Sequence, residues 1–371
     1  MAESKQLLGK LLAQQVKQMP ANTPLHEVEF SVYSQFGEDG IIQFITHHLQ
    51  DKIKNKIFVE IGVQNYSEAN TRFLLENDAW QGVILDACLP DVKQIHASDF
   101  YWRNNLFAKH AFVTRDNVNS LLTDLQLPSE IGLLSVDIDG NDYWVLEKIE
   151  AVKPAIIIVE YNSFFGAEAA ISLPYRENFV WQQHHPATYF GASLAAFCFH
   201  LEQRGYELLG STLAGNNAFF VNKAINQGKL RAVTCADGYR KALFNSIPSP
   251  DVDKFSHQLK CLQYQQVVDV TDLSYKRLSG SHVTNATLSN DFNHKNDFLH
   301  LENEVFLHHA YRYLLCRERD VCGFLNHLAE LKRGVPKEEM LERIRFSEEG
   351  REVAVHIAGL QQKAQLAIAI S

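Results

Sequence analysis

Residues 133–144 read LLSVDIDGNDYW, an apolar run that reaches Asp137 and Asp139 and then passes into turn residues. A short apolar run bounded by turn residues is typical of a buried β-strand. Asp, Gly and Asn favour tight turns, and the residues from Tyr143 onward show helical spacing. The stretch therefore predicts a strand, a loop and a helix, with carboxylates at the point where the strand ends.

The same alternation of apolar runs and helical patterns extends through the first 225 residues, which predicts a parallel sheet with helices on its faces. Strands are expected at 57–61, 82–86, 108–113, 131–137, 155–160, 206–209 and 218–221, and helices at 40–49, 69–77, 89–97, 117–125, 143–149 and 191–204. Four strands end in an acid, namely Glu60, Asp86, Asp137 and Glu160. Because ligands of open α/β sheets bind outside the carboxyl ends of the strands, these acids should lie along one functional rim.

Length and composition limit the possible classes of protein. The chain has 371 residues, 46% of them hydrophobic and 21% charged, which fits a globular protein of two or more domains. A net charge of -9 gives no general attraction to nucleic acid. No run approaches the ~20 apolar residues of a membrane span, and residues 1–20 form an amphipathic helix rather than a signal peptide. We therefore expect a cytoplasmic protein without nucleic-acid partners.

The six cysteines are Cys88, Cys198, Cys235, Cys261, Cys316 and Cys322, and they form no CxxC pair. This spacing argues against a zinc knuckle and against a disulfide framework, so reduced packing thiols are expected.

Changes in pattern divide the chain into four parts. Residues 1–29 form an N-terminal helix and lead-in, and residues 30–272 form the α/β domain. Residues 273–300 are rich in Ser, Thr, Asn and Asp and read as a polar linker. From 301 to 371 the apolar residues recur at helical spacing, which predicts a small all-α domain. One further amphipathic helix is expected at 250–264.

The turn after the first strand can hold a cofactor. Glu60 and the turn amides around Gly62 suit a ligand that carries an ammonium and a carboxylate, as the methionine end of S-adenosylmethionine (SAM) does. Asp86 ends the next strand, at about the spacing of a ribose-binding acid. A dinucleotide fingerprint needs three glycines where this chain has one, which disfavours a nicotinamide-dependent oxidoreductase. Taken singly, each acid could instead be a cap or a loop residue.

A second group of polar residues follows the fourth and fifth strands. Asp137, Asp139, Glu160 and Asn162 could bind Mg²⁺, Mn²⁺ or Ca²⁺ through oxygen atoms, or the carboxylates could supply a general base. Alternatively, residues 139–142 only form a turn and helix cap. His184 lies in an irregular stretch with several aromatic residues, which could line an acceptor site or serve only packing.

The order of these motifs resembles a bacterial branch of the FkbM-like SAM-dependent methyltransferases, over roughly residues 30–270. The resemblance is carried by YSQFGEDG at 33–40, VEIG at 59–62, GVILD at 82–86, VNSLL at 118–122, LLSVDIDGNDYW at 133–144, EYNS at 160–163 and YFGASL at 189–194. It implies a Rossmann-like methyltransferase fold, SAM as methyl donor, and an oxygen acceptor that is often a sugar hydroxyl.

Site residues follow from the resemblance position by position. Glu60 and Gly62 are similar in place to the contacts of the methionine end, Asp86 to the ribose acid, and Asp116 or Asn117 to the adenine side. A segment containing Gln35, Gly37 and Asp39 looks like one that closes over the cofactor. Where the family commonly has Lys-x-Asp-x-Glu-Gly, this chain has Ser135 and Asp139 in place of the Lys and the Glu. Some sugar O-methyltransferases bind Mg²⁺ through acids at the ends of the corresponding strands. The resemblance therefore keeps Asp137, Asp139, Glu160 and Asn162 as candidate metal ligands.

With YLLCRERD at 313–320 and SEEGR at 347–351, residues 302–353 resemble a short helical bacterial domain of unknown function that recurs beside glycan-processing modules, although Cys316 stands where a Gly is usual. This implies an acceptor on a surface polysaccharide or lipopolysaccharide, and a homo-oligomer or docking to glycan-assembly proteins through the C-terminal helices.

The expected function is therefore SAM-dependent O-methylation of a sugar hydroxyl. Asp137 and Asp139 are the candidate bases or metal ligands, Glu160 is their partner and His184 is a second candidate base. The alternative is a non-catalytic nucleotide- or glycan-binding module.

Overall fold

The computed structural model describes residues 2–181, 188–242, 266–277, 295–315, 321–347, 350, 351 and 360. The chain divides into two compact units, and the larger comprises Met1–Val180, Phe190–Pro250 and Val268–Ser274. The predicted helix at 250–264 and most of the predicted linker lie outside the described residues. The predicted domain boundaries stay predictions.

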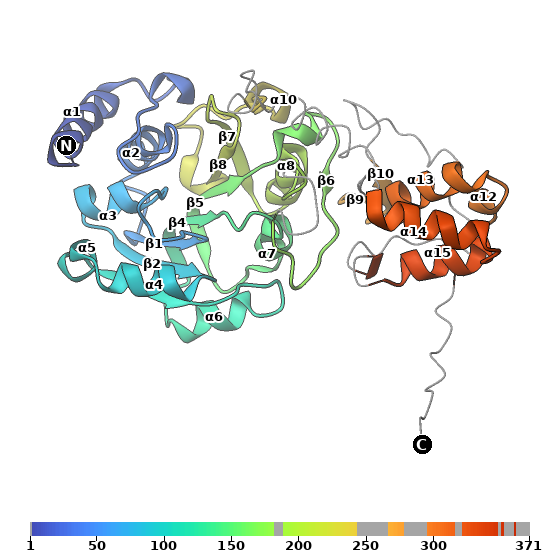
Figure 1. The fold of residues 1–371 in the computed structure, drawn as a ribbon. Coiled ribbons are helices and arrows are strands. Elements are labelled where there is room, and N and C mark those ends of the chain that lie inside the picture. Colours follow the sequence, from blue (N-terminus) through green and yellow to red (C-terminus); the bar gives the residue numbers. More distant parts are fainter. Residues whose placement is uncertain are drawn as a thin grey trace. The chain divides into compact units, whose positions relative to one another are not determined.

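A seven-stranded sheet forms the centre of the larger unit (Figure 1). Its strands are β1 (Ile57–Ile61), β2 (Gln81–Asp86), β3 (Leu106–His110), β4 (Glu130–Val136), β5 (Lys153–Glu160), β7 (Tyr206–Ser211) and β8 (Asn217–Asn222). The order is β3-β2-β1-β4-β5-β8-β7; the first five strands run parallel, and β8 is antiparallel to both neighbours. The predicted α/β, Rossmann-like fold with a mostly parallel seven-stranded sheet is confirmed.

Helices cover both faces of this sheet because alternate strand residues point to opposite sides. Buried side chains of α2 (Glu38–His48), α3 (Arg72–Asp78) and α4 (Leu89–His96) share one core with Phe58, Ile84 and Leu106. The other core joins α6 (Val118–Asp124), α7 (Asp142–Lys148) and α8 (Leu194–Gln203) to the opposite strand faces. The N-terminal helix α1 (Ala2–Gln18) contacts α2.

Shorter elements complete the larger unit. They are η1 (Leu25–Glu27), α5 (Asp99–Arg103), η2 (Ser163–Phe165), β6 (Ile171–Ser172), α9 (Lys223–Asn226) and α10 (Cys235–Gly238). Strand β6 pairs antiparallel with β9 (Gln266–Asp269), and β10 (Tyr275–Arg277) follows in the chain.

The smaller unit contains four described helices, α12 (Asn296–Leu299), α13 (Asn303–Leu314), α14 (Val321–Lys332) and α15 (Lys337–Arg345). Their apolar residues form a separate core that includes Phe298, Phe306, Leu314 and Met340. The helical spacing predicted from residue 302 onward is therefore present. Within the parts that the structure describes, no helix is long and apolar enough to cross a membrane.

Strand β1 lies between β2 and β4, so the crossover connections leave it in opposite directions and open a crevice at its carboxyl end. Gly62 stands at this point with φ +85°, and its amide donates to Leu85 O at 2.9 Å. On the other side, the amide of Asp137 donates to Ile61 O at 2.9 Å. A Cβ at Gly62 would lie 1.6 Å from the carbonyl oxygen of Asp137. Only glycine allows this approach.

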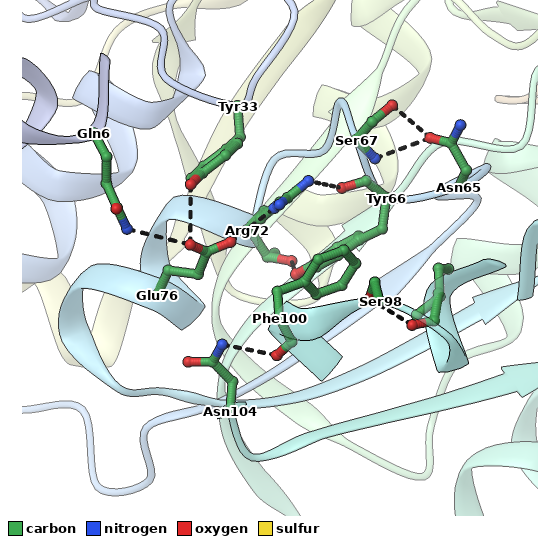
Figure 2. Close-up of polar contacts among 12 residues, drawn as sticks. Gln6, Tyr33, Asn65, Tyr66, Ser67, Arg72, Glu76, Ser98, Phe100 and Asn104 are labelled. Carbon is green, nitrogen blue, oxygen red and sulfur yellow. Dashed lines mark hydrogen bonds and ion pairs between the residues drawn. The ribbon is translucent and has the colours of Figure 1, made fainter. Parts of the chain in front are cut away.

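The loop that follows Gly62 is held by a network around Arg72 on α3 (Figure 2). Arg72 pairs with Glu76 at 2.8 Å, donates to Tyr66 O at 3.0 Å, and lies over the rings of Tyr33 and Phe100 at 4.3 and 4.2 Å. The Tyr33 hydroxyl also donates to Glu76, at 2.9 Å. These contacts fix Tyr66, whose backbone is left-handed (φ 60°), and so fix the exit from the crevice.

Gly62→Ala should destabilise the protein by about 3 kcal/mol or more, because it adds steric overlap with backbone to the ~1–2 kcal/mol cost of a left-handed residue. Gly166→Ala is the matched control, since φ is +81° and nothing lies within 4 Å of its added Cβ. It should cost only about 1 kcal/mol. Urea unfolding of both variants measures the difference. Equal losses would contradict the close approach at Gly62.

Candidate active site at the carboxyl ends of the central strands

Three carboxylates converge where β4 and β5 end. Asp137 follows the last residue of β4, Asp139 lies two residues further on, and Glu160 is the last residue of β5. The two strands pair in parallel with Val136 opposite Val159, so their ends lie side by side. One oxygen from each of the three carboxylates lies within 4.8 Å of the others. We refer to Asp137, Asp139 and Glu160 as the carboxylate cluster.

Asp142, not a member of the cluster, closes the turn between β4 and α7. Its Oδ1 accepts from the amide of Ile138 at 2.7 Å and its Oδ2 from the amide of Gly140 at 2.8 Å. Burial raises the pKa of Asp142 to about 6, although the two amides lower it. The turn that the sequence predicted at 139–142 is present, and Asp142 supplies the side chain that closes it.

The backbone of Asp139 is left-handed, with φ 56°. Such a conformation is uncommon for residues with a side chain, although Asp and Asn tolerate it better than most. Strained residues of this kind gather at functional sites. The hydrogen bonds of Asp142 to the amides on either side of Asp139 hold this conformation in place.

Burial and mutual repulsion make it costly for the cluster to carry three negative charges. The pKa values of Asp137 and Glu160 lie well above their usual range, first because partial burial desolvates both carboxyl groups and second because the neighbouring groups are also acids. The two carboxyl groups lie close together, so a proton held between them would relieve part of their repulsion. Burial also raises the pKa of Asp139.

One oxygen of the cluster, Glu160 Oε2, is buried with no hydrogen-bond partner among the described residues. A buried carboxylate oxygen without a donor is costly, so a site of this kind is completed by a proton, a donor group or a cation.

The two predicted cofactor acids shape the crevice through hydrogen bonds from the backbone. Glu60 is buried and accepts from the amides of Asn70 and Thr71 at 2.9 and 3.2 Å and from the hydroxyl of Thr71. Burial raises its pKa to about 7. Asp86 accepts from the amides of Val63, Gln64 and Cys88 at 2.8, 2.6 and 2.7 Å. Asp86 therefore ties the end of β2 to the turn after β1.

The segment before α2 is built around Asp39. Its Oδ2 accepts from the amides of residues 32, 33 and 34 at 2.7, 2.7 and 2.9 Å, whereas Oδ1 is buried with no partner among the described residues. Burial raises the pKa of Asp39 to about 6. Gly37 precedes α2 and packs on Glu29, and Gln35 is exposed.

Sequence reasoning missed Glu38, which joins this segment to the far side of the sheet. Its Oε1 accepts from Asn217 Nδ2 at 2.9 Å, and Asn217 stands opposite Glu160 in the pairing of β5 with β8. Asn217 Oδ1 is another buried oxygen without a partner among the described residues. The acid pair at the start of a helix was the one sequence signal for Glu38; the contact with a residue 179 positions away had none.

The remaining predicted residues lie around the crevice in different roles. Asn117 holds the loop after β3 through Thr114 N at 2.8 Å and Phe112 O at 2.9 Å, and Asp116 is exposed beside the Tyr175 hydroxyl at 3.5 Å. Asn162 accepts from Phe164 N and donates to Phe190 O, both at 2.9 Å, so its amide supports the chain that follows β5. His184 lies outside the described residues.

No protein-family model and no curated protein matches the chain. Among solved structures, the N-terminal domain of EvdMO1 with S-adenosylhomocysteine (SAH) bound is similar over 57% of this chain and 93% of its own, at 13% identity and TM-score 0.33. An O-methyltransferase from Bacillus cereus in complex with SAH covers 58% and 89% (11%, TM-score 0.29). Coclaurine N-methyltransferase bound to N-methylheliamine and SAH covers 56% and 65% (13%, TM-score 0.28). At these values the likenesses assign neither ligand nor activity.

Two buried acids beside the carboxylate cluster, Glu60 and Asp142, should make stability depend on pH. The folded-state pKa values of Glu60 (about 7) and Asp142 (about 6) exceed the usual values near 4, so the folded state holds protons that the unfolded chain has released. Their contribution to stability is full below about pH 4 and is lost as the pH rises through about 6 to 7.

Asp139→Asn removes one charge from the cluster and keeps a residue that tolerates a left-handed backbone. At pH 8 it should therefore melt a few degrees above the unmodified protein, for a gain of about 1 kcal/mol, and the gain should vanish near pH 4. The exposed Asp116→Asn serves as the control, with an unchanged midpoint. Thermal melts between pH 4 and 8 measure the midpoints of both variants. A lower midpoint for Asp139→Asn than for the unmodified protein at pH 8 would contradict the charge repulsion within the cluster.

Proposed function

We propose that the chain is a SAM-dependent O-methyltransferase. The observation that carries this proposal is the position of the carboxylate cluster directly beside the Gly62 turn, where the crevice of the sheet opens. A cofactor that lies along the ends of β1 and β2 would then have carboxylates beside its reactive end. The motif order of residues 30–270 supports SAM as that cofactor.

The residues present fit the methionine end of SAM. Asp39 Oδ1 is a buried acceptor without a partner among the described residues, and the pKa of Glu60 is raised in part by Asp39. An ammonium group would supply the missing donor and offset both charges. Asp86 holds the turn amides of Val63 and Gln64 at the end of β1, next to the position that a ribose would take.

When bound, SAM supplies a methyl carbon on a sulfonium, which an acceptor oxygen attacks in line with the breaking bond. The chain then has to hold the acceptor hydroxyl close to that carbon and take its proton. A carboxylate whose pKa is raised toward neutrality is a suitable base, and this is the direction of the shift in all three cluster residues. We assign proton removal to Asp139 and Asp137, with Glu160 as their partner in the cluster.

A divalent cation is the other use of the same residues. Three carboxylate oxygens within 4.8 Å of one another suit Mg²⁺ or Mn²⁺. Glu160 Oε2 has no hydrogen-bond partner among the described residues, so it can accept a cation. The ion would supply charge neutralisation and would orient acceptor hydroxyls. Asn162 is a weaker candidate ligand, because its amide oxygen already accepts from Phe164 N.

The acceptor that we propose is a sugar hydroxyl of a bacterial surface glycan or of its precursor, methylated in the cytoplasm. The resemblance of residues 302–353 to a domain found beside glycan-processing modules supports this class. The helices α13 to α15 would then serve self-association or docking to glycan-assembly proteins.

SAH should raise the melting temperature by about 2–4 °C when present at about 100 times its dissociation constant. NAD, which needs the glycines that this chain lacks, should leave it unchanged. Differential scanning fluorimetry and calorimetric titration measure both ligands. Stabilisation by NAD alone would favour an oxidoreductase, and no effect of either ligand would favour a non-catalytic binding module.

Mn²⁺ binding tests whether the carboxylate cluster is a cation site or acts only as a general base. If the cluster holds a cation, Asp139→Asn and Glu160→Gln should weaken Mn²⁺ binding at least tenfold, and binding should weaken below pH 6 as the carboxylates take up protons. Glu130→Gln, an exposed acid at the opposite end of β4, is the matched control. Electron paramagnetic resonance of free Mn²⁺ gives the readout. Equal Mn²⁺ affinity in all variants would show that the cluster does not bind the metal.

Transfer of tritiated methyl groups from SAM to a panel of nucleotide sugars and lipopolysaccharides tests the chemistry. Asp139→Asn should lower transfer by about 100-fold or more, as for the loss of a general base, and should keep the SAH-induced melting shift. Glu130→Gln should transfer normally. Loss of SAH binding in Asp139→Asn would place that residue in the cofactor site instead.

A further inference from the structure

The N-terminal helix α1 packs through its small residues and leaves its leucines exposed. The buried residues of α1 include Gly9, Ala13 and Val16. A Cβ at Gly9 would lie 2.3 Å from Val32 Cγ2, so glycine permits this close approach. The exposed residues are Leu7 at 63%, Leu8 at 57% and Leu11 at 65%, which we call the leucine face. A helix that packs only for stability turns its large apolar side chains toward the core, and α1 does the opposite.

Two polar contacts with α3 fix the rotation of α1 about its own axis. Gln6 Nε2 donates to Glu76 Oε2 at 3.2 Å, as Figure 2 shows, and Lys17 Nζ pairs with Asp78 Oδ1 at 3.2 Å. Eleven residues make about three helical turns, so Gln6 and Lys17 lie on the same side of the helix. The leucine face is therefore held away from α3 near both ends of the helix.

Lysines border the leucine face on both sides. At about 100° per residue, the three leucines fall within an arc of about 100°, and Lys5 and Lys10 each stand about 60° beyond one edge of it. Both lysines are exposed. A lysine stem can lie along an apolar surface while its ammonium group reaches a more polar layer. An apolar strip bordered by lysines is typical of a helix that lies in the interface of an anionic membrane.

We propose that the leucine face docks on the surface of a membrane that contains anionic phospholipids. The leucines enter the boundary of the acyl chains, and the ammonium groups of Lys5 and Lys10 meet lipid phosphates. The inference goes beyond the proposed methyl transfer and does not depend on it. Because the whole chain carries a net charge of -9, general attraction to anionic lipid is excluded, and binding has to use this face.

A second copy of the chain fits the leucine face less well. A helix–helix seam through Leu7 and Leu11 would continue at positions 14 and 18, and both hold glutamine. Three leucine side chains also fall well short of the roughly 800 Å² that each partner buries in a stable interface.

The test is flotation of the full chain with lipid vesicles of two compositions. Binding to an equimolar mixture of phosphatidylglycerol and phosphatidylcholine should be about tenfold or more tighter than to phosphatidylcholine alone, and it should weaken in high salt. Lys5→Gln/Lys10→Gln should lose most of this preference. Leu7→Gln/Leu11→Gln should weaken binding to the mixture by about tenfold or more, because it removes the apolar contact.

The matched controls are Leu325→Gln and Lys332→Gln, which change an exposed leucine and an exposed lysine of α14. Both should bind the vesicles as the unmodified chain does. All variants should keep the melting temperature of the unmodified chain, since the replaced side chains are exposed. If the double leucine variant melts lower, Leu11→Gln takes its place, because Leu11 is the most exposed of the three.

The proposal fails if the unmodified chain does not float with the anionic vesicles, or if the folded leucine variant floats equally well. Light scattering without vesicles tests the other occupant. A dimer that Leu7→Gln/Leu11→Gln converts to a monomer would assign the leucine face to a second copy and overturn the proposal.

Discussion

The close approach of Gly62 to the carbonyl of Asp137 is the contact on which the site depends. It brings the turn after β1 against the end of β4, and so joins the crevice at the end of β1 to the carboxylate cluster. Both halves are otherwise built separately, one by Asp86 and the Arg72 network and the other by Asp142. A side chain at position 62 would push them apart, because backbone rather than a movable side chain stands in its way.

Much of the fold could be predicted from the sequence, because the spacing of apolar residues shows which face of a strand or helix is buried. The strand at 57–61 agrees with β1 residue for residue, and the strand predicted at 82–86 begins one residue earlier, at Gln81. The strand predicted at 108–113 is displaced: β3 spans Leu106–His110, since the chain leaves the ladder after His110 and passes into the loop that Asn117 holds. The two-residue strand β6 gave no signal, because it is too short for any period.

The site was predictable only in part, for a physical reason. Acids at strand ends are visible in the sequence, and the topology of a parallel sheet brings Asp137, Asp139 and Glu160 together. Which acid closes a turn and which remains free depends on side-chain direction, and this separates Asp142 from Asp139. The bond of Glu38 to Asn217 joins distant segments, and no local pattern encodes such a pair.

The antiparallel direction of β8 has a consequence for how such a chain can evolve. Because β8 runs opposite to β5, its first residue, Asn217, faces the rim at which the other strands end. The hairpin turn between β7 and β8 is therefore delivered to the same rim as Glu160, while the paired strands behind it stay in register. Insertions and substitutions in residues 212–216 can reshape one wall of the crevice and leave the Gly62 turn in place, because β5 and β4 lie between them. The sheet thus keeps the Gly62 turn apart from a wall whose residues can change without moving it.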